Sequence, residues 1–248
     1  MRLAKKDGLD KEALLYFKMA LEFVEETFHG LGFCLSQERD LLSQWRGYAN
    51  DGKGFSIGFS RNYLDTCLKQ FNSNKKRKFI LHKVNYNDHD HDDQVRPVYQ
   101  KIKTMFDDGS LKQPTRGGLL TNALGNDFQD EFDKKREDYK NAYHKSYYKI
   151  IELSQLLYVL KKHAFSEEKE WRLITYLIGE DDGSCSYRAA GNRIIPYLEI
   201  DFPSIDIEPI TEVIIGPKNI TPPSIIKTLL EEKGFHGVKV IQSLASYR

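Results

Sequence analysis

The chain has 248 residues, of which 40% are apolar and 29% charged, and its 37 basic and 36 acidic side chains leave a formal net charge of +1. This composition excludes global disorder, and the balanced charge gives no general reason to expect binding to nucleic acid or to an anionic membrane. Three widely spaced cysteines favour a reducing compartment over a disulfide framework. The N-terminus lacks the pattern of a signal peptide, and no apolar run is long enough to span a bilayer, so we expect a cytoplasmic protein.

Apolar spacing and turn residues predict helices and strands in mixed order over the first third of the chain. Asn and Gly at 50–54 supply the positive φ angles that a tight turn needs. In chain order, the pattern predicts a helix at 11–28, a strand at 32–36, an amphipathic helix carrying Leu41, Trp45 and Tyr48, a turn at 50–54, a strand at 55–59, a helix at 61–71 and a strand at 79–84.

The rest of the chain predicts two polar segments, at 86–93 and 107–127, that we expect to be mobile loops. The expected elements are helices at 95–106 and 128–162, strands at 170–178, 194–200 and 212–215, a helix at 221–234 with Thr221 as N-cap, and a strand at 238–242. Strict βαβ alternation is missing. The sequence therefore predicts one α+β domain over residues 1–248, with a mixed, mainly antiparallel sheet and flanking helices.

Three charged segments have simple interpretations. His and Asp alternate from Asp88 to Asp93, but a flexible loop holds no fixed ligand geometry, so we expect no metal site there. The basic run from Lys75 to Lys78, with Lys83 beside it, suits phosphate contact, although a solvated loop is favoured. The backbone amides near Lys218, before the helix at 221, are suited to an anion, but every capped helix offers such an end.

Hydrogen-bonding and stacking groups gather between Phe33 and Tyr48. Ser36 ends a strand and suits either a pocket or the N-cap of the next helix. Trp45 and Tyr48 lie at helical spacing, and for Trp45 we favour a position in the core, because large aromatic side chains at this spacing usually face inward.

A second segment, at 163–174, combines carboxylates with a guanidinium. A strand beginning near Glu168 places Glu168, Glu170 and Arg172 on one face and Trp171 on the other, which we expect to be the buried face. A carboxylate held there is suited to orient a ribose hydroxyl and to stabilise a cationic transition state. Ion pairing with neighbouring strands explains the same residues equally well.

Four segments resemble the bacterial family catalogued as domain of unknown function 2971, and the similarity is strongest over residues 31–248. They are FCLSQERDLLSQWRGYANDGKGFSIGFS, KHAFSEEKEWRLI, TEVIIGPKN and VIQSLASYR. Members of that family usually begin with an additional strand and loop that this chain lacks. The resemblance therefore implies a chain that starts inside the domain.

The strand ending at Ser36 and the Glu-x-Glu at 168–170 also resemble two motifs of ADP-ribosyltransferase-like domains. This resemblance implies an enzyme that uses NAD and no metal, with Ser36, Trp45 and Tyr48 lining the cofactor pocket. It further implies that Glu170 is the catalytic carboxylate and Glu168 its partner, with a protein or nucleic acid as acceptor. The Arg or His of the first motif is not found in this chain.

The alternative is a non-catalytic interaction module or a nucleic-acid-associated module. In that case the same motifs only hold the fold together, and the basic run at 75–78 contacts the partner. The two interpretations differ in geometry. Ser36, Tyr48 and Glu170 around one concave site favour the enzyme, whereas Trp45 and Tyr48 buried far from an exposed Glu170 favour the module.

Overall fold

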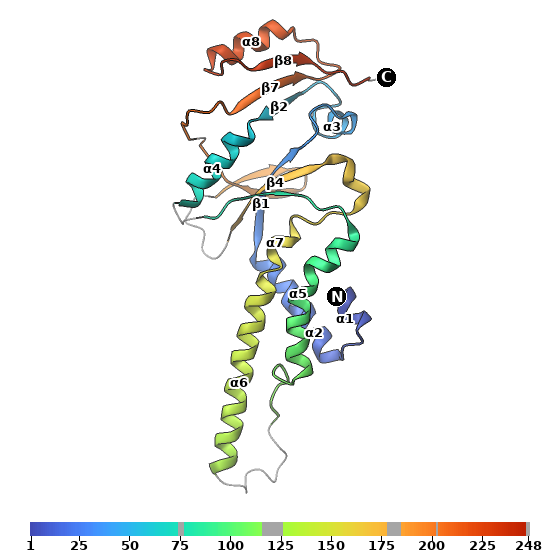
Figure 1. Ribbon diagram of the computed structural model, residues 1–248, viewed down its shortest axis with the longest axis vertical. Helices are drawn as coiled ribbons and strands as arrows, with labels where there is room; N and C mark the ends of the chain where they lie inside the picture. The colour runs from blue at the N-terminus through green and yellow to red at the C-terminus, as the bar shows by residue number, and fades with distance from the viewer. Residues whose placement is uncertain (74–76, 116–125, 178–184, 202, 247–248) are drawn as a thin grey trace. The chain divides into compact units, whose positions relative to one another are not determined.

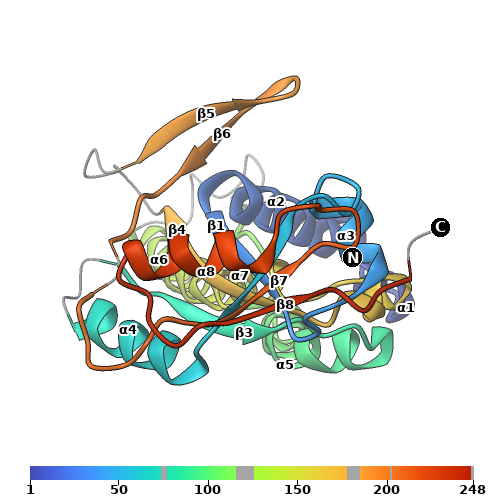
Figure 2. The same ribbon diagram turned by 90° about the horizontal axis from the view of Figure 1, so that it is seen from above.

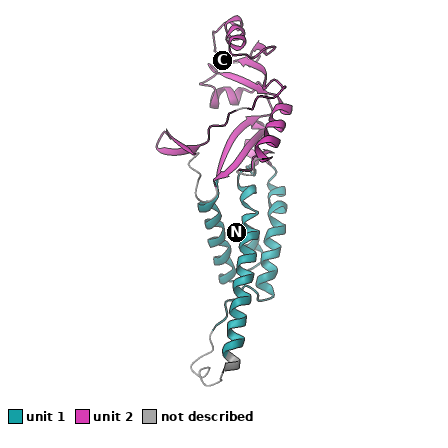
Figure 3. Ribbon diagram, turned by 90° about the vertical axis from the view of Figure 1, so that its left-hand side faces the viewer, with its two compact units in different colours: residues 1–29, 87–162 teal, residues 30–86, 163–248 magenta. Residues whose placement is uncertain are grey.

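The computed structural model describes residues 1–73, 77–115, 126–177, 185–201 and 203–246 (Figure 1). Its mixture of helices and strands confirms the predicted α+β class. The described residues group into two compact units, coloured separately in Figure 3: unit 1 comprises Met1–His29 and Asn87–Lys162, and unit 2 comprises Gly30–Tyr86 and His163–Arg248. One domain is predicted from the sequence; within the described residues the segments of the two units alternate along the chain.

Unit 1 is helical, and its core forms along one face of its second helix. Ala13, Phe17, Ala20 and Val24 are all buried, at the spacing of one helical stripe. The Tyr16 hydroxyl contacts the Ser146 Oγ at 2.5 Å, and burial raises the pKa of this tyrosine to about 12. The helices are α1 Arg2–Lys6, α2 Lys11–Thr27, α5 Asp88–Asp107, α6 Asn126–Ile151 and α7 Ser154–Leu157.

The polar segment at 86–93 is helical, so its prediction as a loop is wrong. Helix α5 begins at Asp88, and the side chain of its N-cap, Asn87, accepts a hydrogen bond from the His89 N–H at 3.1 Å. Asp88 and Asp90 in the first turn complement the helix dipole, which a search for apolar spacing cannot detect. Across the described residues, no three His, Cys, Asp or Glu side chains are grouped to hold a metal ion.

The second predicted loop, at 107–127, lies partly outside the described residues. Its first part turns back on α5, and Leu111 is buried there. Within the described ranges, no helix combines the length and apolar character needed to cross a membrane.

Unit 2 holds two three-stranded sheets and a hairpin. In the first sheet, β4 (Glu170–Leu177) lies between β1 (His29–Ser36) and β3 (Ile80–Lys83). In the second, β7 (Ile210–Ile215) lies between β2 (Phe55–Phe59) and β8 (Lys239–Gln242). Strands β7 and β8 pair in parallel, whereas β2 with β7 and β3 with β4 pair antiparallel, which agrees with the predicted mixed, mainly antiparallel arrangement.

Several boundaries in unit 2 differ from the predictions. Figure 2 shows a hairpin of β5 (Ser186–Ala190) and β6 (Arg193–Tyr197), of which only the second strand is expected from sequence. The helices are α3 Leu42–Tyr48, α4 Arg61–Ser73, the 3-10 helix η2 His163–Glu168 and α8 Pro223–Glu232. The N-cap of α8 is Pro222 rather than Thr221, and the Thr221 N–H donates to the Asn219 Oδ1 at 2.9 Å.

Two loops of unit 2 are joined through their backbones. The Gly216 N–H donates to the Gly54 carbonyl at 3.0 Å, and the Lys218 N–H donates to the Gly52 carbonyl at 2.9 Å. The Lys218 ammonium also pairs with Asp51 at 2.7 Å. These amides and this lysine are therefore engaged within the protein, which overturns the anion-binding alternative for this segment. We call this contact the loop clasp.

Asp40 ties α3 to the segment that follows β8. Its carboxylate accepts hydrogen bonds from the Trp45 Nε1–H at 2.6 Å, the Ser243 hydroxyl at 2.6 Å and the Leu244 N–H at 2.8 Å. Burial opposes ionisation of Asp40, but these three donors outweigh it and lower its pKa. The ionised carboxylate is therefore part of the fold.

Gly216→Ala should destabilise unit 2, because a Cβ there would lie 2.4 Å from the Gly52 carbonyl oxygen and 2.8 Å from that of Gly54. We expect a loss of about 1–3 kcal/mol in the free energy of unfolding. Both tryptophans, Trp45 and Trp171, belong to unit 2, so their fluorescence in urea measures it. Gly47→Ala, in a helix with open space around the site, is the control and should be neutral or stabilising; equal losses would contradict the clasp.

Asp40→Asn should lower the free energy of unfolding at pH 7 by about 1–3 kcal/mol. The asparagine NH2 group is itself a donor, so it cannot accept the hydrogen bonds that one carboxylate oxygen now accepts. The folded pKa of Asp40 is below its unfolded value, so its contribution is complete above about pH 4 and disappears as pH falls through the folded pKa. Urea titrations of wild type and variant should therefore converge at acid pH. A difference that stays constant down to pH 2 would show that Asp40 does not act through its charge.

Candidate functional site

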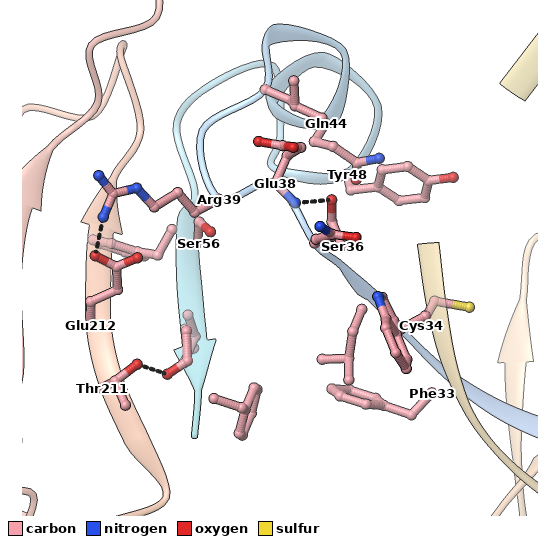
Figure 4. Close-up of a pocket in the computed structure, with 18 of the residues that line it drawn as sticks. Phe33, Cys34, Ser36, Glu38, Arg39, Gln44, Tyr48, Ser56, Thr211 and Glu212 are labelled. Carbon is pink, nitrogen blue, oxygen red and sulfur yellow. Dashed lines mark hydrogen bonds and ion pairs between the residues drawn. The ribbon is translucent and has the colours of Figure 1, made fainter. Parts of the chain in front are cut away.

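Unit 2 contains a pocket of about 1040 Å³ between its two three-stranded sheets. Aromatic, cationic and carboxylate side chains share its lining, and Figure 4 shows them from the end of β1, from α3 and from the second sheet. The charged and aromatic lining residues are Phe33, Glu38, Arg39, Trp45, Tyr48, Phe55, Phe59, Arg61, Lys83, Trp171 and Glu212. The volume is in the range of small-molecule sites.

Ser36 lies in the pocket lining, and its hydroxyl makes hydrogen bonds within the protein. It donates to the Glu168 carbonyl at 2.9 Å and accepts from the Glu38 N–H at 3.1 Å. The Gln37 N–H also donates to the Lys169 carbonyl at 2.9 Å. Ser36 therefore fixes the end of β1 to the turn that precedes β4, and this contact shapes the pocket edge.

Trp45 and Tyr48 both line the pocket but in different ways. Trp45 is 2% exposed and donates its indole N–H to Asp40, which confirms the interpretation of this residue as core. Tyr48 is 75% exposed, so its ring is free to contact a ligand at the pocket edge. The structure thus brings the three predicted pocket residues to one site.

The carboxylates of the Glu-x-Glu pair are not in the pocket lining. Glu168 ends η2 rather than opening a strand, because β4 begins at Glu170. Strand alternation then directs Trp171 into the pocket lining and leaves Glu170 outside it. The structure consequently does not bring Glu170 to the cavity that Ser36 and Tyr48 share.

The burial predicted for β4 is reversed. Glu170 is 7% exposed, whereas Trp171 is only half-buried. The Glu170 carboxylate accepts hydrogen bonds from Arg172 Nε at 2.9 Å and Nη2 at 2.8 Å, and this pairing raises the pKa of Arg172. Because both oxygens of Glu170 accept hydrogen bonds from Arg172, the protein can bury this charged carboxylate. The alternation of apolar and polar residues along the strand does not predict such a buried charge.

The sequence singles out Lys83 beside the basic run, but it does not indicate the other two cations of the lining, Arg39 and Arg61. The Arg61 guanidinium carbon lies 4.7 Å from the centroid of the Trp171 ring, and Lys83 is the cross-strand partner of Trp171. Arg39 pairs with Glu212 at 2.9 Å across the pocket (Figure 4). Lys83 and Trp171 become neighbours only through the β3–β4 register, which no single segment of sequence contains.

Glu170→Gln should lower the free energy of unfolding of unit 2 by about 3 kcal/mol, because it leaves the Arg172 charge inside without its counter-charge. Tryptophan fluorescence during urea unfolding measures the loss. Asp65→Asn is the matched control, since it breaks an exposed Arg61–Asp65 pair on α4 of the same unit and should cost about 0.5 kcal/mol at most. Similar small losses for both variants would show that Glu170 is not a structural charge.

Comparison with known proteins identifies the family. A family model described as protein of unknown function (DUF2971) matches residues 44–173, just over half of the chain, from α3 into β4. Searches of curated proteins and of solved structures found no match. The matched range includes most of α3 together with β2 and β3 of the pocket; it confirms the family resemblance and covers part of the first and most of the second of the four sequence segments. The chain therefore belongs to the DUF2971 family.

Proposed function

We propose that unit 2 binds NAD in its pocket and transfers ADP-ribose from it to a macromolecular acceptor. The observation that carries this proposal is one cavity of about 1040 Å³ lined by Ser36, Trp45 and Tyr48 together with cationic side chains. Planar bases stack on aromatic rings, and phosphates pair with Arg and Lys, so the lining offers both kinds of contact that a dinucleotide needs.

The proposal assigns the nicotinamide end to the α3 side of the pocket. Figure 4 shows Ser36, Glu38, Gln44 and Tyr48 on this side, and Arg39, Ser56 and Glu212 on the other. Tyr48 provides an exposed ring, and Gln44 provides an amide that can both donate and accept hydrogen bonds, as the carboxamide of nicotinamide requires.

The transfer breaks the bond between ribose C1′ and the nicotinamide nitrogen. Its electron pair leaves with the ring, which becomes neutral nicotinamide, and the ribose acquires oxocarbenium character. An acceptor nucleophile then bonds to C1′ and loses its proton to a base or to water. An ionised carboxylate near the ribose favours the cationic transition state, as in glycoside hydrolysis.

Glu38 is the carboxylate that we assign to this role. It lines the pocket beside Ser36 and is held by Lys169 at 2.5 Å, which keeps it in place. Glu170 and Glu168, implied by the resemblance, lie outside the lining and would act on the reaction only by positioning the turn that carries Lys169.

The proposal includes a cytoplasmic bacterial setting. The three cysteines are few and widely spaced in the sequence, which supports a reducing compartment. The acceptor remains a protein or a nucleic acid. Of the basic run at 75–78, Lys75 and Lys76 lie outside the described residues, so the alternative of a nucleic-acid partner at that run gains no support from the fold.

One observation favours a second candidate, a nucleotide-binding module without catalysis. Both carboxylates that line the pocket are ion-paired, Glu38 with Lys169 and Glu212 with Arg39. A carboxylate neutralised in this way stabilises a ribosyl cation less than a free one. Binding of NAD without turnover would therefore fit the same cavity.

The test is nicotinamide release from NAD by the full chain, with bacterial cell extract as the source of acceptor. Wild type should release nicotinamide, and Glu38→Gln should lower the rate by about 100-fold, because the change keeps the shape and removes the charge. Glu170→Gln, corrected for its folded fraction, should keep most of the rate.

The outcomes separate the candidates. Loss of rate in folded Glu170→Gln with an unchanged rate in Glu38→Gln would make Glu170 the essential carboxylate and overturn our assignment. Wild-type protein that binds NAD but releases no nicotinamide would support the non-catalytic module. Protein that neither binds NAD nor releases nicotinamide would refute the proposed function.

A further inference from the structure

Two cationic side chains converge on Trp171 from different elements of unit 2. Arg61 comes from the first turn of α4 and lies over the indole ring at 4.7 Å. Lys83 lies directly opposite Trp171 in the antiparallel β3–β4 register, so both side chains leave the sheet on the same face. All three residues line the pocket.

The donors of these cations are largely unused. Asp65 accepts from Arg61 through the Nε–H alone, at 2.9 and 3.0 Å from its two oxygens, so the terminal guanidinium nitrogens keep their hydrogen-bonding capacity. The Lys83 ammonium has no hydrogen-bond or ion-pair partner among the described residues, and the contact of this residue with His82 is made by its backbone carbonyl. Asp65 also holds the Arg61 side chain in one orientation, which reduces the entropy that a ligand must overcome.

The carboxylates of the pocket lining do not pair with Arg61 or Lys83. The lining contains the carboxylates of Glu38 and Glu212. Glu38 is paired with Lys169, and Glu212 is paired with Arg39. The lining therefore contains three cations, Arg39, Arg61 and Lys83, and two carboxylates. Among the described residues, no carboxylate is paired with Lys83.

We infer that Arg61 and Lys83 form the diphosphate subsite of the pocket, next to Trp171. This inference rests on the proposed nucleotide binding and adds the ligand class, a nucleoside diphosphate group, and the residues that select it. A guanidinium binds two phosphate oxygens at once, and the ammonium adds a point charge. The subsite requires no chemistry at the ribose and holds equally for an enzyme or a binding module.

The experiment is isothermal titration calorimetry of the full chain with ADP and with adenosine, which lacks the phosphates. ADP should bind more tightly than adenosine by about tenfold or more. Arg61→Gln and Lys83→Gln should each weaken ADP binding by about tenfold and leave adenosine binding unchanged. Arg61→Lys should fall in between, because it keeps the charge and loses the planar fork.

Lys69→Gln on α4 is the matched control, since it removes the same charge from an exposed position outside the lining and should change ADP binding by less than about twofold. Both test positions are exposed, so the variants should keep the wild-type melting temperature. Equal affinity for ADP and adenosine, no binding of ADP, or equal effects of Lys69→Gln and Lys83→Gln would each overturn the subsite. Phosphate-dependent ADP binding without nicotinamide release would retain the subsite and refute only the transfer reaction.

Discussion

The pocket of unit 2 depends on the ionised carboxylate of Asp40. This side chain accepts hydrogen bonds from the Trp45 indole on α3 and from two groups that follow β8. Helix α3 has only seven residues, so its own backbone hydrogen bonds are too few to stabilise it, and the contacts of Asp40 hold it in place. The loop clasp fixes the other end of the same helix through carbonyls that follow it at Gly52 and Gly54. With α3 held at both ends, Tyr48 is presented at the pocket edge.

The same contacts join segments of unit 2 that lie far apart in the sequence, of which the first overlaps the family match at 44–173. Asp40 and the clasp glycines belong to the first segment, Gly216 to the third and Ser243 to the last. Gln242 adds a further bond to the Gly216 carbonyl at 2.9 Å. These residues are structural, and the ligand-facing groups that we propose, Arg61 and Lys83, lie outside the four segments.

The local sequence pattern was sufficient to predict helices and strands that depend only on residues close together in the chain. Strand β2 matches its predicted residues, and α2 and β8 differ by one residue at an end, because apolar spacing and turn glycines act within a few residues. It correctly indicated a helix at 95–106, within α5, but failed for residues 88–93, where a polar N-cap and the helix dipole start the helix. The local pattern singles out Ser36, Trp45 and Tyr48 as residues near a site. It does not indicate that Glu170 is buried, which depends on its pairing with Arg172, or that Arg61 approaches Trp171, which depends on tertiary packing.

The central claim is that a nucleotide diphosphate lies against Trp171 in this pocket. A crystal structure of the full chain with ADP-ribose tests it most directly. We predict diphosphate oxygens within hydrogen-bonding distance of both Arg61 and Lys83, and an aromatic ring of the ligand stacked on a pocket side chain. ADP-ribose bound elsewhere on the protein, or an empty pocket in crystals grown with saturating ligand, would contradict the claim.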